Sequence, residues 1–209
     1  MTLDRLRPLA DRLILPFVET ADRIGLTPDG VSVVALVFAA LAGVAYTLAG
    51  TAVAGLQPTP LLYGVGALLV FLNGWMDLLD GALARRQGAE SRAGDLLDHV
   101  LDRYADIVIL AGLAAGTGTY RFGFLAVTGV LMTSYLGTQA QAVGLDRVYG
   151  GLVGRADRLA IIGAVTAVAT VYTAEPFGFS LVAWLLVFFA AVGHFTALQR
   201  FYYSVSELG

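Results

Sequence analysis

The sequence has 209 residues, of which 57% are hydrophobic and only 14% charged, with a formal net charge of −3 at pH 7. A soluble domain is on average about 45–50% apolar and about 25% charged, so this composition argues against a water-soluble protein and suffices for several membrane spans of about 20 residues each. The slight negative charge gives no indication of nucleic-acid binding, and the absence of cysteine excludes disulfides and thiolate metal sites.

Residues 2–23 predict an amphipathic helix that lies on the membrane surface. Apolar side chains recur at helical spacing with charged side chains between them. The apolar set is Leu3, Leu6, Leu9, Leu13 and Phe17, and the charged set is Arg5, Arg7, Asp11 and Arg12. Pro8 and Pro16 interrupt the pattern. The alternative is a core helix of a soluble protein, which the remainder of the sequence argues against.

The rest of the chain predicts six membrane spans, so that residues 1–209 form one all-α membrane domain. The spans are expected at about 28–49, 60–84, 94–116, 120–143, 157–174 and 177–203. The first begins at Thr27 and Pro28, a typical helix start. Stretches that contain glycine and proline, at 50–60 and 174–178, separate neighbouring spans.

Arginine is distributed unequally between the two ends of these spans. All 13 basic residues are arginine. Eleven of them precede the first span, lie between the second and third or the fourth and fifth, or lie near the end of the sixth, whereas Arg121 stands alone on the opposite side and Arg103 falls inside the third span. The positive-inside rule therefore predicts that both termini are cytoplasmic in a multi-pass protein of the cell membrane.

Four aspartates lie at the cytoplasmic ends of two predicted spans. Asp77 and Asp80 are three residues apart near the end of the second span, and Asp98 and Asp102 are four residues apart near the start of the third. Each pair therefore shares one face of its helix, and residues 86–93 allow the chain to turn so that the two faces meet. Charges inside a span are costly and indicate a functional site.

Four convergent carboxylates repel one another unless cations compensate their charge. Oxygen ligands favour Mg²⁺, Mn²⁺ or Ca²⁺, and such ions catalyse phosphoryl chemistry when they bridge phosphate oxygens. A cation transporter is the main alternative, because acidic clusters also mark ion pathways. Transporters, however, usually place such groups near the membrane midplane on broken helices. A catalytically inactive membrane scaffold is a third possibility, against which the complete acidic set argues.

Other polar residues near this cluster have simpler explanations. Asp95 is expected to cap a helix, and Asp106 is expected to form an ion pair with Arg103, three residues earlier on the same helix. His99 and His194 follow no pattern and are interpreted as packing residues.

The residues of the second and third spans form a motif that resembles the signature of the CDP-alcohol phosphotransferases, also called CDP-alcohol phosphatidyltransferases. It reads Asp77-x2-Asp80-Gly81-x2-Ala84-Arg85-x8-Gly94-x3-Asp98-x3-Asp102. Every fixed position is filled, and the six spans with an amphipathic N-terminal helix also match, so that the resemblance covers nearly the whole chain.

The resemblance implies a role for each motif residue. Asp77, Asp80 and Asp98 would hold two Mg²⁺ or Mn²⁺ ions per subunit, and Asp102 would join them and act as general base. The residues implied to contact a CDP-lipid are Asp29, Ser32, Gly81, Ala84, Arg85, Ser91 and Gly94. The reaction implied is transfer of a lipid-phosphate group from a CDP-lipid, such as CDP-diacylglycerol or CDP-archaeol, to a polar alcohol with release of CMP. The family also implies a homodimer.

The acceptor alcohol is indicated less clearly. Arg155 and Arg158 border the loop between the fourth and fifth spans, and Arg200 lies at the same level of the sixth, so that three arginines and Gln139 are candidates for binding a phosphorylated alcohol. The positive-inside rule alone also explains these arginines. The inositol-phosphate branch of the family has basic residues on the fourth span, where this chain has Gly137 and Gln139. The sequence therefore favours glycerol phosphate over inositol phosphate and serine.

Overall fold

The computed structural model describes residues 7–146 and 152–209, and residues 2–6 of the predicted interfacial helix lie outside this part of the chain. The described residues form seven α-helices and one 3₁₀ turn. The helices are α1 (Arg7–Arg23), α2 (Pro28–Gly50), α3 (Leu61–Gln87), α4 (Arg92–Thr117), α5 (Tyr120–Ala142), α6 (Arg155–Ala169) and α7 (Leu181–Leu208), and the turn is η2 (Pro176–Gly178). Between α2 and α3, Val53 and Leu56 form an isolated β-bridge. The prediction of an all-α chain is confirmed.

The helices α2, α3 and α7 are each long and apolar enough to cross a membrane. Their starts and ends follow local sequence signals. The Thr27 hydroxyl accepts a hydrogen bond from the Gly30 amide at the start of α2, and the Ser180 hydroxyl does the same for Ala183 in α7. These caps satisfy amide groups that have no partner within the helix.

The predicted fifth and sixth spans differ most from the helices observed. The helix α6 ends at Ala169, five residues before the predicted end, and α7 begins at Leu181 rather than near residue 177. Between them Pro176 opens the turn η2, in which Phe177 has a positive φ of 59°. Pro176 and this turn account for the late start of α7, whereas α6 ends at Ala169, well before the proline. At 15 residues, α6 is about 22 Å long, which is shorter than a bilayer core.

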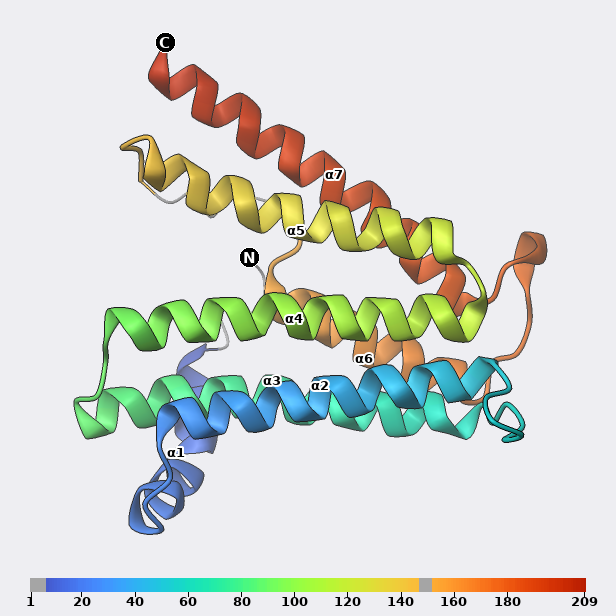
Figure 1. The fold of residues 1–209 in the computed structure, drawn as a ribbon, viewed down its shortest axis with the longest axis horizontal. Helices are drawn as coiled ribbons and strands as arrows, with labels where there is room; N and C mark the ends of the chain where they lie inside the picture. The colour runs from blue at the N-terminus through green and yellow to red at the C-terminus, as the bar shows by residue number, and fades with distance from the viewer. Residues whose placement is uncertain (1–6, 147–151) are drawn as a thin grey trace.

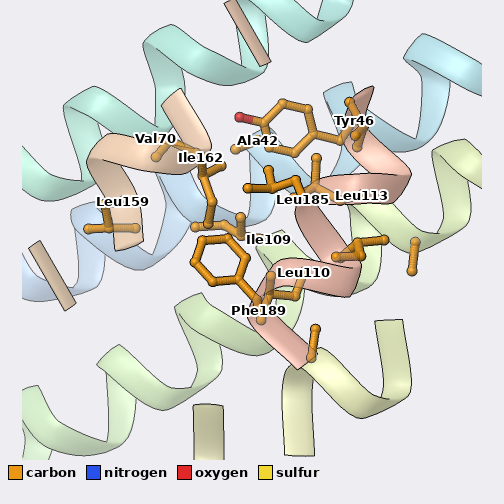
Figure 2. Close-up of a cluster of buried hydrophobic side chains, with 14 of the residues drawn as sticks. Ala42, Tyr46, Val70, Ile109, Leu110, Leu113, Leu159, Ile162, Leu185 and Phe189 are labelled. Atoms are coloured by element: carbon orange, nitrogen blue, oxygen red, sulfur yellow. The ribbon is translucent and has the colours of Figure 1, made fainter. Parts of the chain in front are cut away.

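The long helices pack around one apolar core. Figure 2 shows side chains of different helices meeting there, among them Tyr46 of α2, Val70 of α3, Ile109 of α4, Ile162 of α6 and Phe189 of α7. The only polar atom of Tyr46, its hydroxyl, is 3.0 Å from the Thr166 hydroxyl, so that the buried phenol is hydrogen-bonded.

Glycine allows α2 and α4 to approach closely. A Cβ atom added at Gly43 of α2 would lie 2.5 Å from the carbonyl oxygen of Val108 in α4, and one added at Gly112 of α4 would collide with the backbone of Gly43. Helix packing of this kind, through small residues, is typical of membrane proteins. It brings the N-terminal ends of α2 and α4 to the same region.

The helix α1 packs against the C-terminal half of α3. Ile14, Val18 and Ala21 of α1 form a second apolar cluster with Leu79 and Leu83 of α3 and with Val31 of α2. Asp22 of α1 accepts hydrogen bonds from Arg86 and Gln87 at 3.0 Å each. Figure 1 shows that α1, the α3–α4 turn, the end of α5 and the C-terminus lie at the same end of the long helices.

Candidate metal and phosphate site

Two helices carry the four motif aspartates to that end of the molecule. The helix α3 ends at Gln87 and is capped by Gly88, whose left-handed φ of 60° suits glycine. After three more residues, the Ser91 hydroxyl accepts a hydrogen bond from the Gly94 amide at 3.0 Å and starts α4. The short turn sets α4 beside α3, so that the faces that carry the acids meet as the sequence predicts.

Three of the four carboxylates converge. Asp77, Asp98 and Asp102 each offer an oxygen atom, and these atoms lie within 4.8 Å of one another. The set consists of carboxylates alone, which are the ligands that Mg²⁺ and Mn²⁺ prefer. The donor set therefore fits a hard divalent cation.

The fourth carboxylate, Asp80, is turned toward α2. It is buried, and its Oδ2 accepts a hydrogen bond from the Ser32 hydroxyl at 2.6 Å. Asp80 and Ser32 line a small cavity together with Asp98 and Asp102. The structure thus places three of the four predicted ligands around one cavity, with Ser32 as the side chain that orients Asp80, while Asp77 joins Asp98 and Asp102 in the convergent set.

The residues expected to contact a CDP-lipid lie on the first turns of α2, the last turns of α3 and the start of α4. Asp29 stands in the exposed first turn of α2, and its Oδ1 would be 3.6 Å from a Cβ atom added at Gly94, so that the glycine leaves room between α2 and α4. Arg85 is exposed one turn beyond Gly81, and its Nη1 lies on the bare side of that glycine. Ala84 is half-buried, and Ser91 caps α4.

Arg155, the first residue of α6, reaches directly into the carboxylate cluster. Its Nη1 lies 2.5 Å from Asp77 Oδ2, and its Nη2 lies 2.7 Å from Asp102 Oδ1. One guanidinium group thus bridges α3 and α4. The sequence placed Arg155 near an acceptor phosphate and did not predict its contact with two of the four aspartates.

Arg158, one turn further along α6, belongs to a buried ion network. Its Nε and Nη2 donate to the two carboxylate oxygens of Asp106 at 3.2 and 2.6 Å. Arg103 contacts the same carboxylate at 3.6 Å and also donates to the Ser134 hydroxyl. The predicted pair of Asp106 with Arg103 exists, but Arg158 is the closer partner because its forked guanidinium meets both oxygens.

The other predicted acceptor residues have different surroundings. The Nη1 of Arg200 donates to the Thr133 carbonyl at 2.6 Å in the protein interior, whereas Gln139 is exposed on α5. Thr133 and Arg158 line a small cavity with Thr196, whose buried hydroxyl has no hydrogen-bond partner among the described residues. Sequence reasoning missed Thr196 because threonine in an apolar span follows no recognisable pattern.

His99 is also nearer to the cluster than the sequence suggested. Its Nδ1 lies 3.7 Å from Asp98 Oδ2, and about half of the side chain is exposed. It is therefore a neighbour of a predicted ligand and not a buried packing residue. His194, in contrast, is within 3.4 Å of the Thr128 hydroxyl between α5 and α7.

A groove of about 510 Å³ between α3 and α6 opens beside the cluster. Its walls are apolar, with Phe71, Trp75 and Leu159 among them, and within the described part of the chain its charged lining residues are Asp77 and Arg155 alone. A second cavity of about 400 Å³ lies around Tyr63 and Glu175, where α2 and α4 end, and none of the motif aspartates lines it. The acidic cluster is thus associated with the groove along α3 and α6.

Comparisons with known proteins agree with this geometry. The archaetidylinositol phosphate synthase of Methanothermobacter thermautotrophicus is 33% identical over 96% of this chain and 93% of its own. The crystal structure of Mycobacterium tuberculosis phosphatidylinositol phosphate synthase with CDP-DAG bound is 25% identical, covers 92% of this chain and 94% of that one, and superposes with a TM-score of 0.74. The same enzyme in complex with manganese and citrate has a TM-score of 0.73 at 25% identity, over 90% of this chain and 87% of that one.

The family model for CDP-alcohol phosphatidyltransferase matches residues 25–197, which include all four motif aspartates and the helices that carry them. Together with the relatives above, this match confirms the resemblance seen in the sequence and excludes a cation transporter as the interpretation of the acidic cluster. The chain belongs to the CDP-alcohol phosphatidyltransferase family, and it is a metal-dependent transferase of phospholipid synthesis.

Proposed function

We propose that this protein transfers the lipid-phosphate group of a CDP-lipid to an inositol phosphate and releases CMP. The observation that carries the proposal is the convergence of Asp77, Asp98 and Asp102 where α3 and α4 lie side by side, next to an apolar groove of about 510 Å³. A polar, metal-binding end and an apolar groove are what a substrate with a pyrophosphate and acyl or ether chains requires.

The choice of inositol phosphate reverses the order that the sequence favoured. The relatives named above are synthases of archaetidylinositol phosphate and phosphatidylinositol phosphate, and this supports inositol phosphate over glycerol phosphate. The missing basic residues at Gly137 and Gln139 of α5 are offset by Arg103, which extends from α4 to Ser134 of α5. A guanidinium from α4 thus faces the part of α5 where the branch has its own basic side chains.

The lipid chains and the nucleotide of the CDP-lipid would occupy two different parts of the protein. The lipid chains would lie in the groove between α3 and α6, whose walls are apolar. The nucleotide would lie at the exposed end of α3 and α4, near Asp29, Ser32 and Arg85, with Gly81, Ala84, Ser91 and Gly94 leaving room for it. The scissile phosphorus then falls at the junction of groove and carboxylates, where Asp77 stands.

Asp77, Asp80, Asp98 and Asp102 would hold two Mg²⁺ or Mn²⁺ ions per subunit. When bound, such ions neutralise the pyrophosphate and the charge that develops on the leaving group. The remaining chemistry belongs to the side chains. Asp102 takes the proton from the acceptor hydroxyl, the oxygen attacks the lipid-side phosphorus, the bond between that phosphorus and the CMP oxygen breaks, and Arg85 binds the CMP that leaves.

The membrane arrangement completes the proposal. Six spans in one domain, with both termini and the site on the cytoplasmic side, accord with the arginine distribution and with the common end at which α1, the α3–α4 turn and the C-terminus lie (Figure 1). A homodimer is proposed from the family alone. The site at the ends of the helices lets a water-soluble alcohol enter while the lipid chains stay in the bilayer.

An acceptor screen tests the function. Purified protein in detergent would receive CDP-diacylglycerol or CDP-archaeol, Mg²⁺ and one acceptor at a time, with release of CMP as the readout. The acceptors are inositol phosphate, glycerol phosphate, inositol, glycerol and serine. Release of CMP only with inositol phosphate is the expected result, whereas release with serine or glycerol phosphate but not inositol phosphate would refute the proposed acceptor.

A further inference from the structure

The guanidinium of Arg155 is bound to two of the carboxylates that a metal ion would use. Asp77 and Asp102 belong to the set of three carboxylates that can surround a cation, and Arg155 is bound to one oxygen of each. Both contacts are short, and 17% of the Arg155 side chain is exposed. Because a divalent cation and a guanidinium repel each other at such distances, the two cannot share these carboxylates without loss of affinity for one of them.

The same contact blocks the proposed base. Oδ1 of Asp102 accepts from Arg155 at 2.7 Å, and Oδ2 lies 3.7 Å from the guanidinium of Arg103. An oxygen that already accepts a charge-assisted hydrogen bond is a poor acceptor for the proton of an alcohol. Asp102 therefore becomes available as a base when Arg155 moves away from it.

Arg155 also lines two neighbouring spaces. It lines the small cavity around Asp80, Asp98 and Asp102, and it lines the apolar groove between α3 and α6 as well. Its Nε is buried and has no hydrogen-bond partner among the described residues, so that nothing observed holds this end of the guanidinium in place. Arg158, in contrast, is fixed to Asp106 through both Nε and Nη2.

We propose that Arg155 is a displaceable counter-ion of the metal site. Its guanidinium pairs Asp77 with Asp102 until divalent ions take these carboxylates, and the released guanidinium then binds a phosphate group of the substrate. The second half of this statement rests on the proposed function, whereas the first half concerns metal binding alone. Metal binding thereby releases the guanidinium of Arg155 and supplies a phosphate ligand in one movement.

The test is the affinity for Mn²⁺, measured in detergent by electron paramagnetic resonance of the free ion without any substrate. Arg155→Gln removes the competing charge and should bind Mn²⁺ about tenfold or more tightly than the unmodified protein, the factor that loss of one charge-assisted hydrogen bond corresponds to. Arg86→Gln is the matched control, because Arg86 pairs with Glu19 and Asp22 away from the cluster. Its affinity should not change.

A second variant and a thermal melt show whether a change in Mn²⁺ affinity arises only because Arg155→Gln fails to fold. Arg155→Lys keeps the charge but cannot bridge two carboxylates with one forked group, and its affinity should lie between those of the other two proteins. Without divalent ions Arg155→Gln should melt below the unmodified protein, and Mn²⁺ should raise its melting temperature more. If both Arg155 variants bind Mn²⁺ as tightly as the unmodified protein or more weakly, the proposal that Arg155 is a displaceable counter-ion is wrong.

The outcomes separate this inference from the proposed function. If Arg155→Gln binds Mn²⁺ more tightly but the unmodified protein releases no CMP with inositol phosphate, the counter-ion role is supported and the proposed function is refuted. Unchanged Mn²⁺ binding in a protein that makes the expected product refutes the counter-ion alone. If both hold, Arg155→Gln should also raise KM for inositol phosphate or the CDP-lipid about tenfold or more relative to Arg86→Gln.

Discussion

Replacement of Asp106 by asparagine tests the buried network that joins α4 to α6. Asp106 and Arg158 are 3% and 5% exposed, and the carboxylate accepts two hydrogen bonds from the guanidinium. Removal of one partner of such a pair leaves an uncompensated buried charge and costs about 3–5 kcal/mol. Asparagine keeps one acceptor oxygen, so we expect the lower end, about 3 kcal/mol, which for a chain of this size lowers Tm by about 6–12 °C.

The measurement is a thermal melt in detergent, with Asp95→Asn as the matched control. Asp95 lies on the same helix but is exposed in its first turn, where a carboxylate contributes only about 0.3–1 kcal/mol. An unchanged melting temperature for Asp106→Asn would refute the structural role. A variant that is stably folded but inactive would show instead that Asp106 belongs to the catalytic set.

Three further predictions address the base, the topology and the docking of α1. Asp102→Asn should lower kcat by about 10²–10⁴ without rescue by excess Mg²⁺, whereas Asp98→Asn should recover part of its activity as Mg²⁺ is raised; the reverse pattern in a Mg²⁺ titration of CMP release would exchange the two roles. Cysteine in place of the exposed Gln57 should react with an impermeant thiol reagent outside intact cells, and cysteine in place of the exposed Glu90 should not; the opposite labelling would invert the orientation. The pKa of Asp22 lies below its ordinary 3.8 because Gln87 and Arg86 donate hydrogen bonds to it, so its stabilisation of docked α1 is present above that value and is lost as the pH falls through the lowered pKa. The ring of Trp75 lies 5.3 Å from that of Phe17 in α1, measured between centroids, so its fluorescence in a Trp184→Phe background should change below about pH 4 as α1 loosens. Asp22→Asn should remove the part of this change that depends on Asp22. An identical pH titration with and without Asp22→Asn would contradict the role of Asp22 in docking α1.

The helices and the meeting of the acidic faces could be predicted because local rules determine them. Spacing of three and four residues places Asp77 with Asp80 and Asp98 with Asp102 on helix faces, and Gly88 and Ser91 mark the turn between them. The predicted spans that correspond to α2, α4 and α5 agree with those helices to within two residues.

Partners that are distant in the sequence could not be predicted in this way. Asp106 was assigned to Arg103 because these residues share a helix face, but Arg158, 52 residues away, has the better forked geometry. Arg155 satisfies the positive-inside rule as well as an acceptor site, and only the approach of α6 to α3 shows that it contacts Asp77. The start of α7 was predicted too early for another reason, since hydropathy does not record the turn η2 that precedes the helix.

The central claim is that this chain makes a phosphoinositide-type lipid from a CDP-lipid with the help of divalent ions held by the aspartates. The most direct measurement combines purified protein, CDP-lipid and inositol phosphate and quantifies CMP and the lipid product by mass spectrometry, with Mg²⁺ present or removed by EDTA. We expect equimolar CMP and lipid product with Mg²⁺, none with EDTA, and recovery when Mg²⁺ or Mn²⁺ is restored. Full product formation in metal-free buffer, or CMP release without a phosphorylated inositol lipid, would contradict the claim.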